Sequence, residues 1–231
     1  KKLPTTATPP AGRFSDTFQE LSKETDSIVC IMTSSGLSAT IESAREAVER
    51  AKQSLPQLGV EVVDTYTVGG AQGLVVLEAA RAAASGQDIT QVAERAKSVI
   101  KKVNLIITVN TLHYLIKGGR IGLASGWAGT LLSVKPILEC STSVGMLQGL
   151  ERPRTRRKAV ERLLGVMKER VGEAPVHVIV NHADVPDEGE ELRERVSSMF
   201  NCAELYLTEW TPVIGVHTGP GMLGLSFYAE D

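Results

Sequence analysis

The sequence predicts an α/β fold in two domains that meet near Lys102. Before this point, apolar runs of strand length alternate with segments of helical periodicity, which is typical of parallel strands covered by helices. After it, apolar runs at 135–140 and 145–150 flank a short turn and indicate a hairpin. We therefore expect an N-terminal α/β domain at 1–102 with a parallel sheet, and a C-terminal α/β domain at 103–231 with a mixed or antiparallel sheet.

The N-terminal part should contain two strands and three helices. The stretch at 5–14 holds two prolines and is expected to be an extended loop, because the residue before a proline disfavours helix. Ser85 and Gly86 predict the stop of one helix before the start of the next. By hydrophobic periodicity, we expect strands at 27–32 and 60–64, and helices at 37–51, 71–84 and 88–102.

The C-terminal part should contain six strands and four helices. One helix ends at a glycine pair, one is rich in small residues, one is basic and one is acidic. These helices are expected at 111–119, 122–132, 156–170 and 188–200. The strands are expected at 104–110, 135–140, 145–150, 176–181, 203–210 and 222–228.

Composition argues against several classes of function. The 231 residues are 42% hydrophobic and 23% charged, which is ordinary for a globular protein. A formal net charge of −2 gives no basic surplus for binding nucleic acid. No apolar run is long enough to span a membrane, and no signal segment opens the sequence. The three cysteines lie far apart in mostly apolar runs, so we expect buried thiols in a cytoplasmic protein.

Two polar stretches beside predicted helices are candidate anion sites. TSSGLSAT at 33–40 places hydroxyl groups at a helix start, where free backbone N–H groups attract an anion. The alternative is an ordinary helix cap formed by Ser35 or Ser38. KGGRIG at 117–122 would offer the planar guanidinium of Arg120 to phosphate or carboxylate. It does not match a GxxxxGK[ST] loop, and the alternative is a helix end with an exposed arginine.

Two further stretches point to an anion or to a partner. RPRTRRKA at 152–159, with Arg154 near its start, forms either a solvated face or a docking surface for an acidic or phosphate-bearing partner. HTGPG at 217–221 would form a glycine nest whose N–H groups point at an anion, with His217 donating beside it. The alternative is a tight turn with an exposed histidine. No histidine has a partner at the spacing of a metal site, so we expect no bound metal.

Together, these stretches resemble the DegV family of bacterial fatty-acid-binding proteins. The resemblance covers essentially the whole chain through seven stretches in order, PTTATPPAGRF, SSGLSATIESA, VVDTYTVGGAQGLVVLEAA, TLHYLIKGGRIG, LLSVKPIL, PRTRRKA and GVHTGPGMLGL. It implies a two-domain DegV-like α/β fold with a long-chain fatty acid in a tunnel between the domains. It also implies a binding subunit without catalytic machinery or cofactor, which presents the carboxylate to an ATP-dependent fatty acid kinase that forms acyl phosphate.

The resemblance also assigns roles to individual residues. Thr6 in TTATPP, Ser38 in SSGLSAT and His217 in HTGPG are implied to bind the carboxylate of the fatty acid. Arg120 of GGRI and Arg154 before the basic helix are implied to serve phosphoryl chemistry or partner docking. The turns that support these side chains are expected to depend on Gly36, Gly119, Gly219 and Gly221.

The chain departs from the family pattern at three places. Ala7, Thr8 and Ala39 replace the Ser, Gln and Gly that usually stand there, so hydrogen bonds within the first loop are expected to differ. Family members usually begin with a strand carrying an Asp-Ser-Thr turn, then a helix and another strand. This sequence starts after that segment, so we expect part of the first sheet to be missing from it.

The residues agree with a buried acyl chain. Each CH₂ group of an acyl tail contributes roughly 0.8 kcal/mol when it leaves water, so a palmitate-like chain needs little polar help. Its carboxylate needs partners, because a lone buried charge is costly. Thr6, Ser38 and His217 would supply three donors, and a protonated His217 would balance the charge. Aromatic residues make up 4% of the chain, which suits a flexible alkyl guest better than a planar cofactor.

Two functions of other classes stay open. A stand-alone hydrolase would use Ser38 as nucleophile and His217 as base, although Ser38 lies outside a GxSxG elbow and no orienting acid is evident. A phosphate- or nucleotide-binding module would use the loop at Gly119 and Arg120. The hydrolase would turn over a chromogenic ester and the module would copurify with a nucleotide, so both can be distinguished from a carrier.

Overall fold

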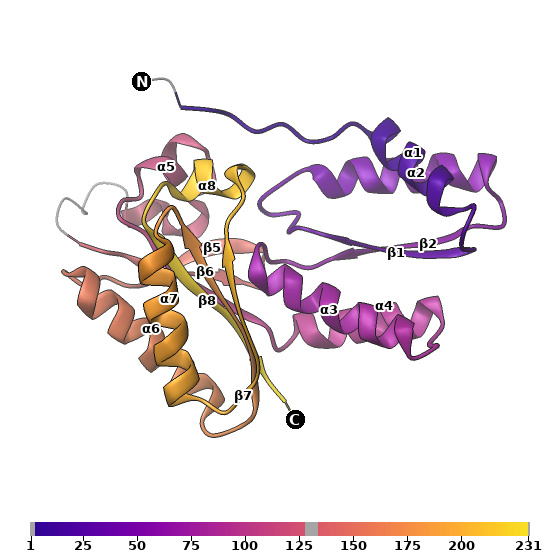
Figure 1. Ribbon diagram of the computed structural model, residues 1–231. Helices are drawn as coiled ribbons and strands as arrows, with labels where there is room; N and C mark the ends of the chain where they lie inside the picture. Colours follow the sequence, from indigo (N-terminus) through magenta and orange to yellow (C-terminus); the bar gives the residue numbers. More distant parts are fainter. Residues whose placement is uncertain (1–2, 128–133, 231) are drawn as a thin grey trace.

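The computed structural model describes residues 3–127 and 134–230 and contains two β-sheets (Figure 1). The small sheet pairs β1 (Ser27–Met32) with β2 (Gly59–Asp64), and the large sheet has the strand order β5-β4-β3-β8-β6-β7. The small sheet lies between two helix pairs, which are α1 (Ala11–Leu21) with α2 (Thr40–Ser54), and α3 (Gly70–Ala84) with α4 (Ile89–Ile100).

The strands of the small sheet are parallel, as the alternation of strands and helices predicts. Their pairing runs from Ser27 opposite Gly59 to Met32 opposite Asp64, and α2 makes the crossover between them. The buried face of α2 consists of Ile41 and three alanines, whose small side chains let the helix approach the sheet closely. This arrangement confirms the predicted strand–helix–strand unit.

The large sheet is mixed, as expected for the C-terminal part. Its strands are β3 (Asn104–Thr108), β4 (Ile137–Ser141), β5 (Met146–Glu151), β6 (Val176–Ala183), β7 (Cys202–Glu209) and β8 (Met222–Ala229). Strands β6 and β7 are parallel neighbours, and the other described pairs are antiparallel, including the predicted β4–β5 hairpin. Helices α6 (Arg156–Val171) and α7 (Pro186–Met199) cover one face of this sheet.

Successive residues of β3, a strand in the middle of the large sheet, face two different cores. Leu105 and Ile107 pack in a core with α3 and α4, whereas Ile106 packs in a second core with α6 and α7. The first core also contains Val63 of β2, so α3 and α4 bury apolar side chains against both sheets. The predicted boundary near Lys102 falls between α4 and β3, and the division into two domains stays a prediction.

The structure contains two helices that the sequence interpretation missed. Helix α1 begins within the stretch expected to be a loop, where Pro10 is extended (φ −69°, ψ 156°) and precedes the first helical residue. The helix is stabilised by burial of Phe18 against α2. Helix α8 (Pro212–Thr218) has its proline in the first turn, where a missing N–H costs nothing. In both cases a proline stands at the start of a helix, and Pro10 had suggested irregular structure.

Smaller corrections concern the segment after β3. Helix α5 (His113–Lys117) ends at glycine as predicted. The small-residue helix is instead a 3₁₀ helix, η1 (Gly122–Trp127), and the rest of its expected range, 128–132, lies outside the described residues. The cysteines are free thiols, as expected, but only Cys140 is fully buried, since Cys30 and Cys202 are partly exposed.

A buried polar network fixes the start of α3 against the large sheet. The fully buried Asn181 on β6 accepts hydrogen bonds at Oδ1 from the Gly70 backbone N–H (3.2 Å) and from Trp210 Nε1 (2.9 Å). Its Nδ2 donates to the Ser226 hydroxyl at 3.0 Å. A Cβ at Gly70 would overlap with Asn181, so the close approach of helix and strand requires a glycine there.

Candidate functional site

Two segments far apart in the sequence meet at one hydrogen bond. Thr6, in the extended segment before α1, and His217, in the last turn of α8, are joined by Oγ1 and Nε2 at 3.0 Å. Both side chains are half-buried, so the pair can be reached by a ligand. The structure therefore brings together two of the three residues expected to bind a carboxylate.

This pair lies in a cavity of about 520 Å³ that also contains positive charge. The polar part of its wall includes Thr6, His217, Lys117 and Arg120. Two cations beside two hydroxyl or imidazole donors form an environment that favours an anion over a neutral polar group. Lys117 was quoted in the sequence motif without a role, and its place in a cationic loop was the signal that could have marked it.

Arg120 connects the cavity to the loop that follows β1. Its Nε donates to the Leu37 carbonyl at 3.1 Å and its Nη1 to the Gly118 carbonyl at 2.8 Å. The guanidinium thus fastens the turn after α5 to the segment next to Ser38. Two of its nitrogens donate to backbone carbonyls, so Arg120 holds the loops of the site in place and also supplies positive charge.

Ser38 lies next to this cavity but is not part of the wall described above. Its hydroxyl is 2.7 Å from Thr40 Oγ1 and accepts the Thr40 backbone N–H at 3.2 Å, while Ala39 occupies the N-cap position of α2. Ser38 therefore satisfies a donor at the helix start, close to the ordinary capping alternative. Its neighbour Leu37 is held by Arg120, which places the Ser38 loop beside the cationic part of the site.

The environment of His217 favours the neutral imidazole. Burial lowers the pKa of His217, and the positive charge of Arg120 lowers it further. That a protonated His217 balances a bound carboxylate stays a prediction, and Arg120 and Lys117 place further positive charge in the wall of the same cavity. His217 Nδ1 is buried beside Gly118 and has no hydrogen-bond partner among the described residues.

The predicted glycine nest is wrong in detail. The Gly219 N–H donates to the Gly215 carbonyl and the Gly221 N–H to the Ala183 carbonyl, both at 2.8 Å, so neither points at an anion. Both glycines have positive φ, +74° and +83°, and they end α8 and turn the chain into β8. Their role is to hold the helix that carries His217.

The other two glycines expected to support turns are Gly36 and Gly119. Each is the sequence neighbour of a residue whose carbonyl accepts a hydrogen bond from Arg120. Gly36 approaches the turn between β4 and β5, where a Cβ would lie 2.5 Å from the Gly145 carbonyl oxygen. Gly119 has φ +68° and reverses the chain after α5. Both therefore shape loops that reach the site, while neither donates to it in the described contacts.

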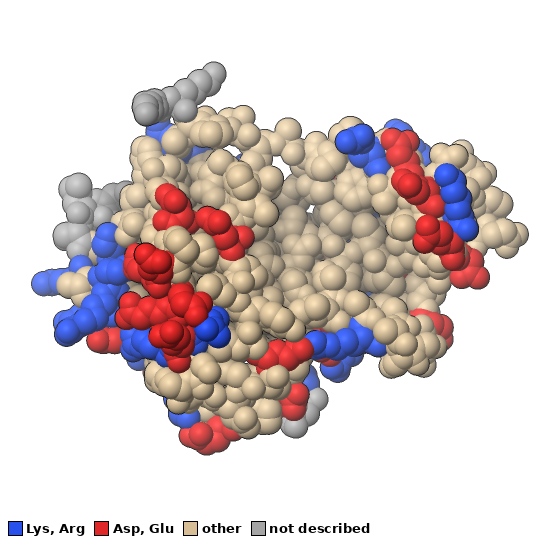
Figure 2. Space-filling model, viewed as in Figure 1, with Lys and Arg blue, Asp and Glu red and all other residues tan. Residues whose placement is uncertain are grey.

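Arg154 lies elsewhere, in the exposed loop before α6. Figure 2 shows Lys and Arg side chains gathered over α6 on the left of the view. The exposed cations of this basic surface are Arg152, Arg154, Arg157 and Lys158. Arg156 differs from them, because it turns inward and its Nε donates to Glu188 of α7 at 2.9 Å. The structure thus separates Arg154 from Arg120, although the sequence interpretation gave both the same role.

Two structural features are absent from the residues that the structure describes. No helix within them is long and apolar enough to cross a membrane. No group of three or more His, Cys, Asp or Glu side chains among them is arranged to hold a metal ion.

Comparisons with known proteins place the chain in a family. Residues 1–230 match the family model described as "Uncharacterised protein, DegV family". The DegV domain-containing protein SCO2569 of Streptomyces coelicolor is 35% identical over 223 residues, which cover 96% of this chain and 77% of that protein.

Two solved structures share the fold over nearly the full chain. The DegV family protein from Thermus thermophilus, described by its fatty acid binding, has a TM-score of 0.90 and 30% identity, covering 98% of this chain and 79% of that one. DegV from Bacillus subtilis, described as a fatty acid binding protein, has a TM-score of 0.87 and 30% identity with the same coverage. The chain, an α/β protein with a small parallel sheet and a mixed six-stranded sheet, therefore belongs to the DegV family.

Proposed function

We propose that this protein binds a long-chain fatty acid and holds its carboxylate at the cavity of Thr6, His217 and Arg120. The observation that carries the proposal is the hydrogen bond between Thr6 and His217 beside a guanidinium, because these groups supply donors and positive charge for a carboxylate. Two relatives of 30% identity are described as fatty acid binding proteins, which supports the same ligand.

The acyl tail is proposed to run from this cavity into the apolar layer between the two sheets. Leu37, Ile121 and Ile214 are half-buried, pack on the core around α3 and α4, and each lies within a few residues of a site residue. An apolar wall that continues from a cationic cavity fits an amphiphile with one charged end. Burial of roughly 0.8 kcal/mol per CH₂ group would provide most of the affinity.

The ligand can be identified from the purified protein without deciding beforehand which compound to test. Native mass spectrometry of the protein purified from bacteria should show a copurified mass of a fatty acid of about sixteen to eighteen carbons. After delipidation, titration with palmitate should restore the complex. A copurified nucleotide, or a protein that takes up no fatty acid, would overturn the proposal.

Substitution at the site tests the carboxylate partners. His217→Ala is expected to weaken palmitate binding at least about tenfold, since a hydrogen bond to a charged group contributes about 1.5–3 kcal/mol. Ser38→Ala should weaken it less, because the Ser38 hydroxyl already has a partner in Thr40. Titration of delipidated variants measures both effects, and His113→Ala, at an exposed histidine of α5, is the matched control. Unchanged affinity in both site variants would refute this assignment.

We further propose that the bound acid is presented to a separate ATP-dependent kinase, as the family resemblance implies. Arg154 and its exposed neighbours form a cationic surface suited to an acidic partner. Arg154→Ala should leave palmitate affinity unchanged and lower the rate of acyl-phosphate formation in a coupled assay with the kinase. Arg50→Ala, at an exposed arginine of α2, is the control. A normal coupled rate for Arg154→Ala would remove it from docking.

The hydrolase alternative receives less support from the geometry. The Ser38 hydroxyl is bonded to Thr40, and the described contacts of His217 lead to Thr6 instead of Ser38. A nucleophile needs its base within hydrogen-bond reach, so this arrangement lacks the essential pair. Turnover of a chromogenic ester that disappears in Ser38→Ala would restore the hydrolase. The nucleotide-module alternative is weakened similarly, because Arg120 donates to two backbone carbonyls.

A further inference from the structure

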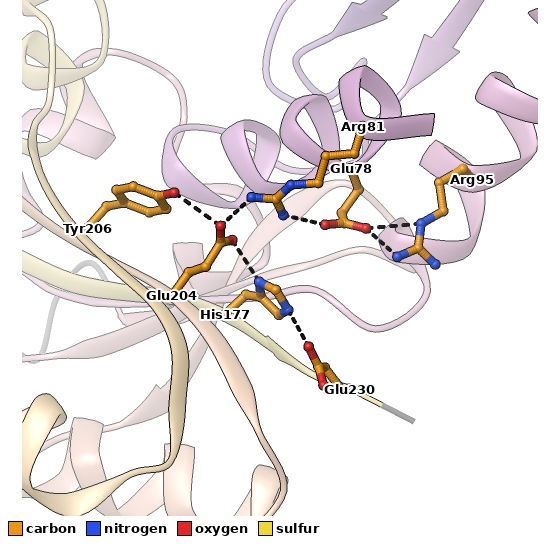
Figure 3. Close-up of polar contacts among 7 residues, drawn as sticks. All are labelled: Glu78, Arg81, Arg95, His177, Glu204, Tyr206 and Glu230. Atoms are coloured by element: carbon orange, nitrogen blue, oxygen red, sulfur yellow. Dashed lines mark hydrogen bonds and ion pairs between the residues drawn. The ribbon is translucent and has the colours of Figure 1, made fainter. Parts of the chain in front are cut away.

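A chain of polar contacts joins helices α3 and α4 to the large sheet, at the opposite end of β6 from the turn that follows α8 (Figure 3). We call it the ionic chain, and its members in order of contact are Arg95, Glu78, Arg81, Glu204, His177 and Glu230. They come from α4, α3, β7, β6 and the residue after β8, so the ionic chain links four elements and the segment that follows a fifth. The signs alternate along it when the histidine is charged.

The helical end of the ionic chain is a buried carboxylate with two cationic partners. Glu78 is 5% exposed, and it accepts from Arg81 Nη1 at 2.6 Å and from Arg95 Nε at 3.0 Å. Burial raises the pKa of Glu78, but the hydrogen bonds from both arginines outweigh it and bring the pKa below its usual range. Arg81 also donates to Glu204, which carries the contact from helix to sheet.

The sheet end of the ionic chain holds a histidine between two carboxylates. His177 is 8% exposed, with Nδ1 at 2.8 Å from Glu204 and Nε2 at 2.9 Å from Glu230. Carboxylate oxygens accept hydrogen bonds and do not donate them, whereas a neutral imidazole has a single N–H. Both contacts are therefore hydrogen bonds only when the ring carries two protons.

The groups around the ring keep their own charge states. Burial raises the pKa of Glu204, but hydrogen bonds from Arg81 and His177 outweigh it, so its pKa lies below the usual range. Tyr228 stacks on the His177 ring at a centroid distance of 4.6 Å, and burial followed by the charge of Glu78 raises its pKa. The phenol therefore stays neutral. His177 and Tyr228 line a cavity of about 320 Å³, and Arg95 and Lys102 line it from the α4 side. Tyr206 donates a hydrogen bond to Glu204.

We propose that the protonation state of the His177 ring determines how many contacts of the ionic chain link the α3–α4 pair to the ends of the large sheet's strands. With two ring protons, each carboxylate faces a cation or an N–H donor. When the ring loses one proton, one carboxylate faces a lone pair and its contact is lost. Glu230 is released, because its side chain is 48% exposed, whereas Glu204 is 23% exposed and keeps Arg81 and Tyr206.

The direction of the pH dependence follows from which form makes the contacts. The charged ring makes both, so the contribution of His177 to stability is present at lower pH and is lost as the pH rises. Glu78 and Glu204 act in the opposite sense, because carboxyls with lowered pKa values lose their contribution as the pH falls through those values. All contacts of the ionic chain are therefore present only at intermediate pH, where both carboxyls are charged and the His177 ring carries two protons.

Urea unfolding of the full chain at several pH values tests the proposal. Between about pH 5.5 and about pH 8.5, the stability difference between wild type and His177→Gln should fall by at least about half. His113→Gln, at an exposed histidine of α5, should show a difference that does not change with pH. A His177→Gln difference that stays constant or grows with pH would overturn the proposal.

A measurement on the wild type keeps the test valid if His177→Gln does not fold. Nitrogen-15 NMR should show both His177 ring nitrogens protonated near about pH 6, with one proton lost as the pH rises. Amide exchange at the end of β8 should then speed up beyond its intrinsic pH dependence, and Glu230→Gln should remove most of this extra change. A ring with one proton at every pH, or amide exchange at the end of β8 without this extra change, would refute the proposal.

Discussion

Replacing Asn181 by leucine is expected to lower the free energy of unfolding by about 3 kcal/mol or more, because each buried group left unpaired costs about 1–3 kcal/mol. Two donors lose their acceptor at once, the Gly70 backbone N–H and Trp210 Nε1. Leucine has as many side-chain heavy atoms as asparagine but is bulkier, so no cavity forms and the loss combines the two unpaired donors with crowding in the core. Urea unfolding with a two-state fit measures it.

An exposed asparagine provides the control for this change. Asn201→Leu, just before β7, makes the same replacement at a solvent-exposed position and should change the free energy of unfolding little. Asn181→Asp keeps an acceptor oxygen but loses the Nδ2 donor to Ser226 and adds a buried charge, so it should also be destabilising. If Asn181→Leu costs no more than the control, the network does not fix the start of α3.

Gly118→Ala is expected to weaken palmitate binding at least about tenfold while the protein still folds. The added Cβ would overlap with His217 Nδ1, so the imidazole must move away from Thr6. Gly118 has φ −80°, which alanine adopts without strain, and the closest atom to the added Cβ is His217 Nδ1, with the Tyr114 carbonyl oxygen farther away at 3.1 Å. Titration of the delipidated protein gives the affinity, and thermal unfolding reports whether the fold is kept.

A second glycine near the site separates displacement of His217 from a general glycine effect. Gly215→Ala lies in the same helix as His217, and a Cβ there meets nothing within 4 Å. It should preserve palmitate binding, since alanine favours helix over glycine. Equal loss of affinity in Gly118→Ala and Gly215→Ala would show that α8, and not the imidazole position, determines binding.

Local patterns predicted the strands better than the helices beside prolines. Each strand of the small sheet and the β4–β5 hairpin follows from compact apolar runs, because burial on a sheet requires those side chains. Helix α8 is seven residues long and begins with a proline, so too few turns exist for a periodicity to be visible. Helix α1 was missed for a related reason, since Pro10 hid the helix that begins after it.

The site could be predicted only in part, because local patterns do not give distances in space. Thr6 and His217 are 211 positions apart, and the family resemblance, not the spacing, put them together. The glycine nest was wrong because its N–H groups bond to carbonyls of α8 and β6, which no local pattern reveals. His177 was given little weight, since Glu78 and Glu230 are widely separated from it in sequence and resemble ordinary surface charges.

The contact between Thr6 and His217 turns most of the polypeptide into one closed loop. The entropy lost on closing a loop grows only slowly, with each doubling of its length adding about 0.6 kcal/mol. A contact across 211 positions therefore costs only about 3 kcal/mol more to close than a contact within a short turn. A guest that bridges the same two segments adds a removable cross-link to the hydrogen bond that already joins the extended N-terminal segment to α8.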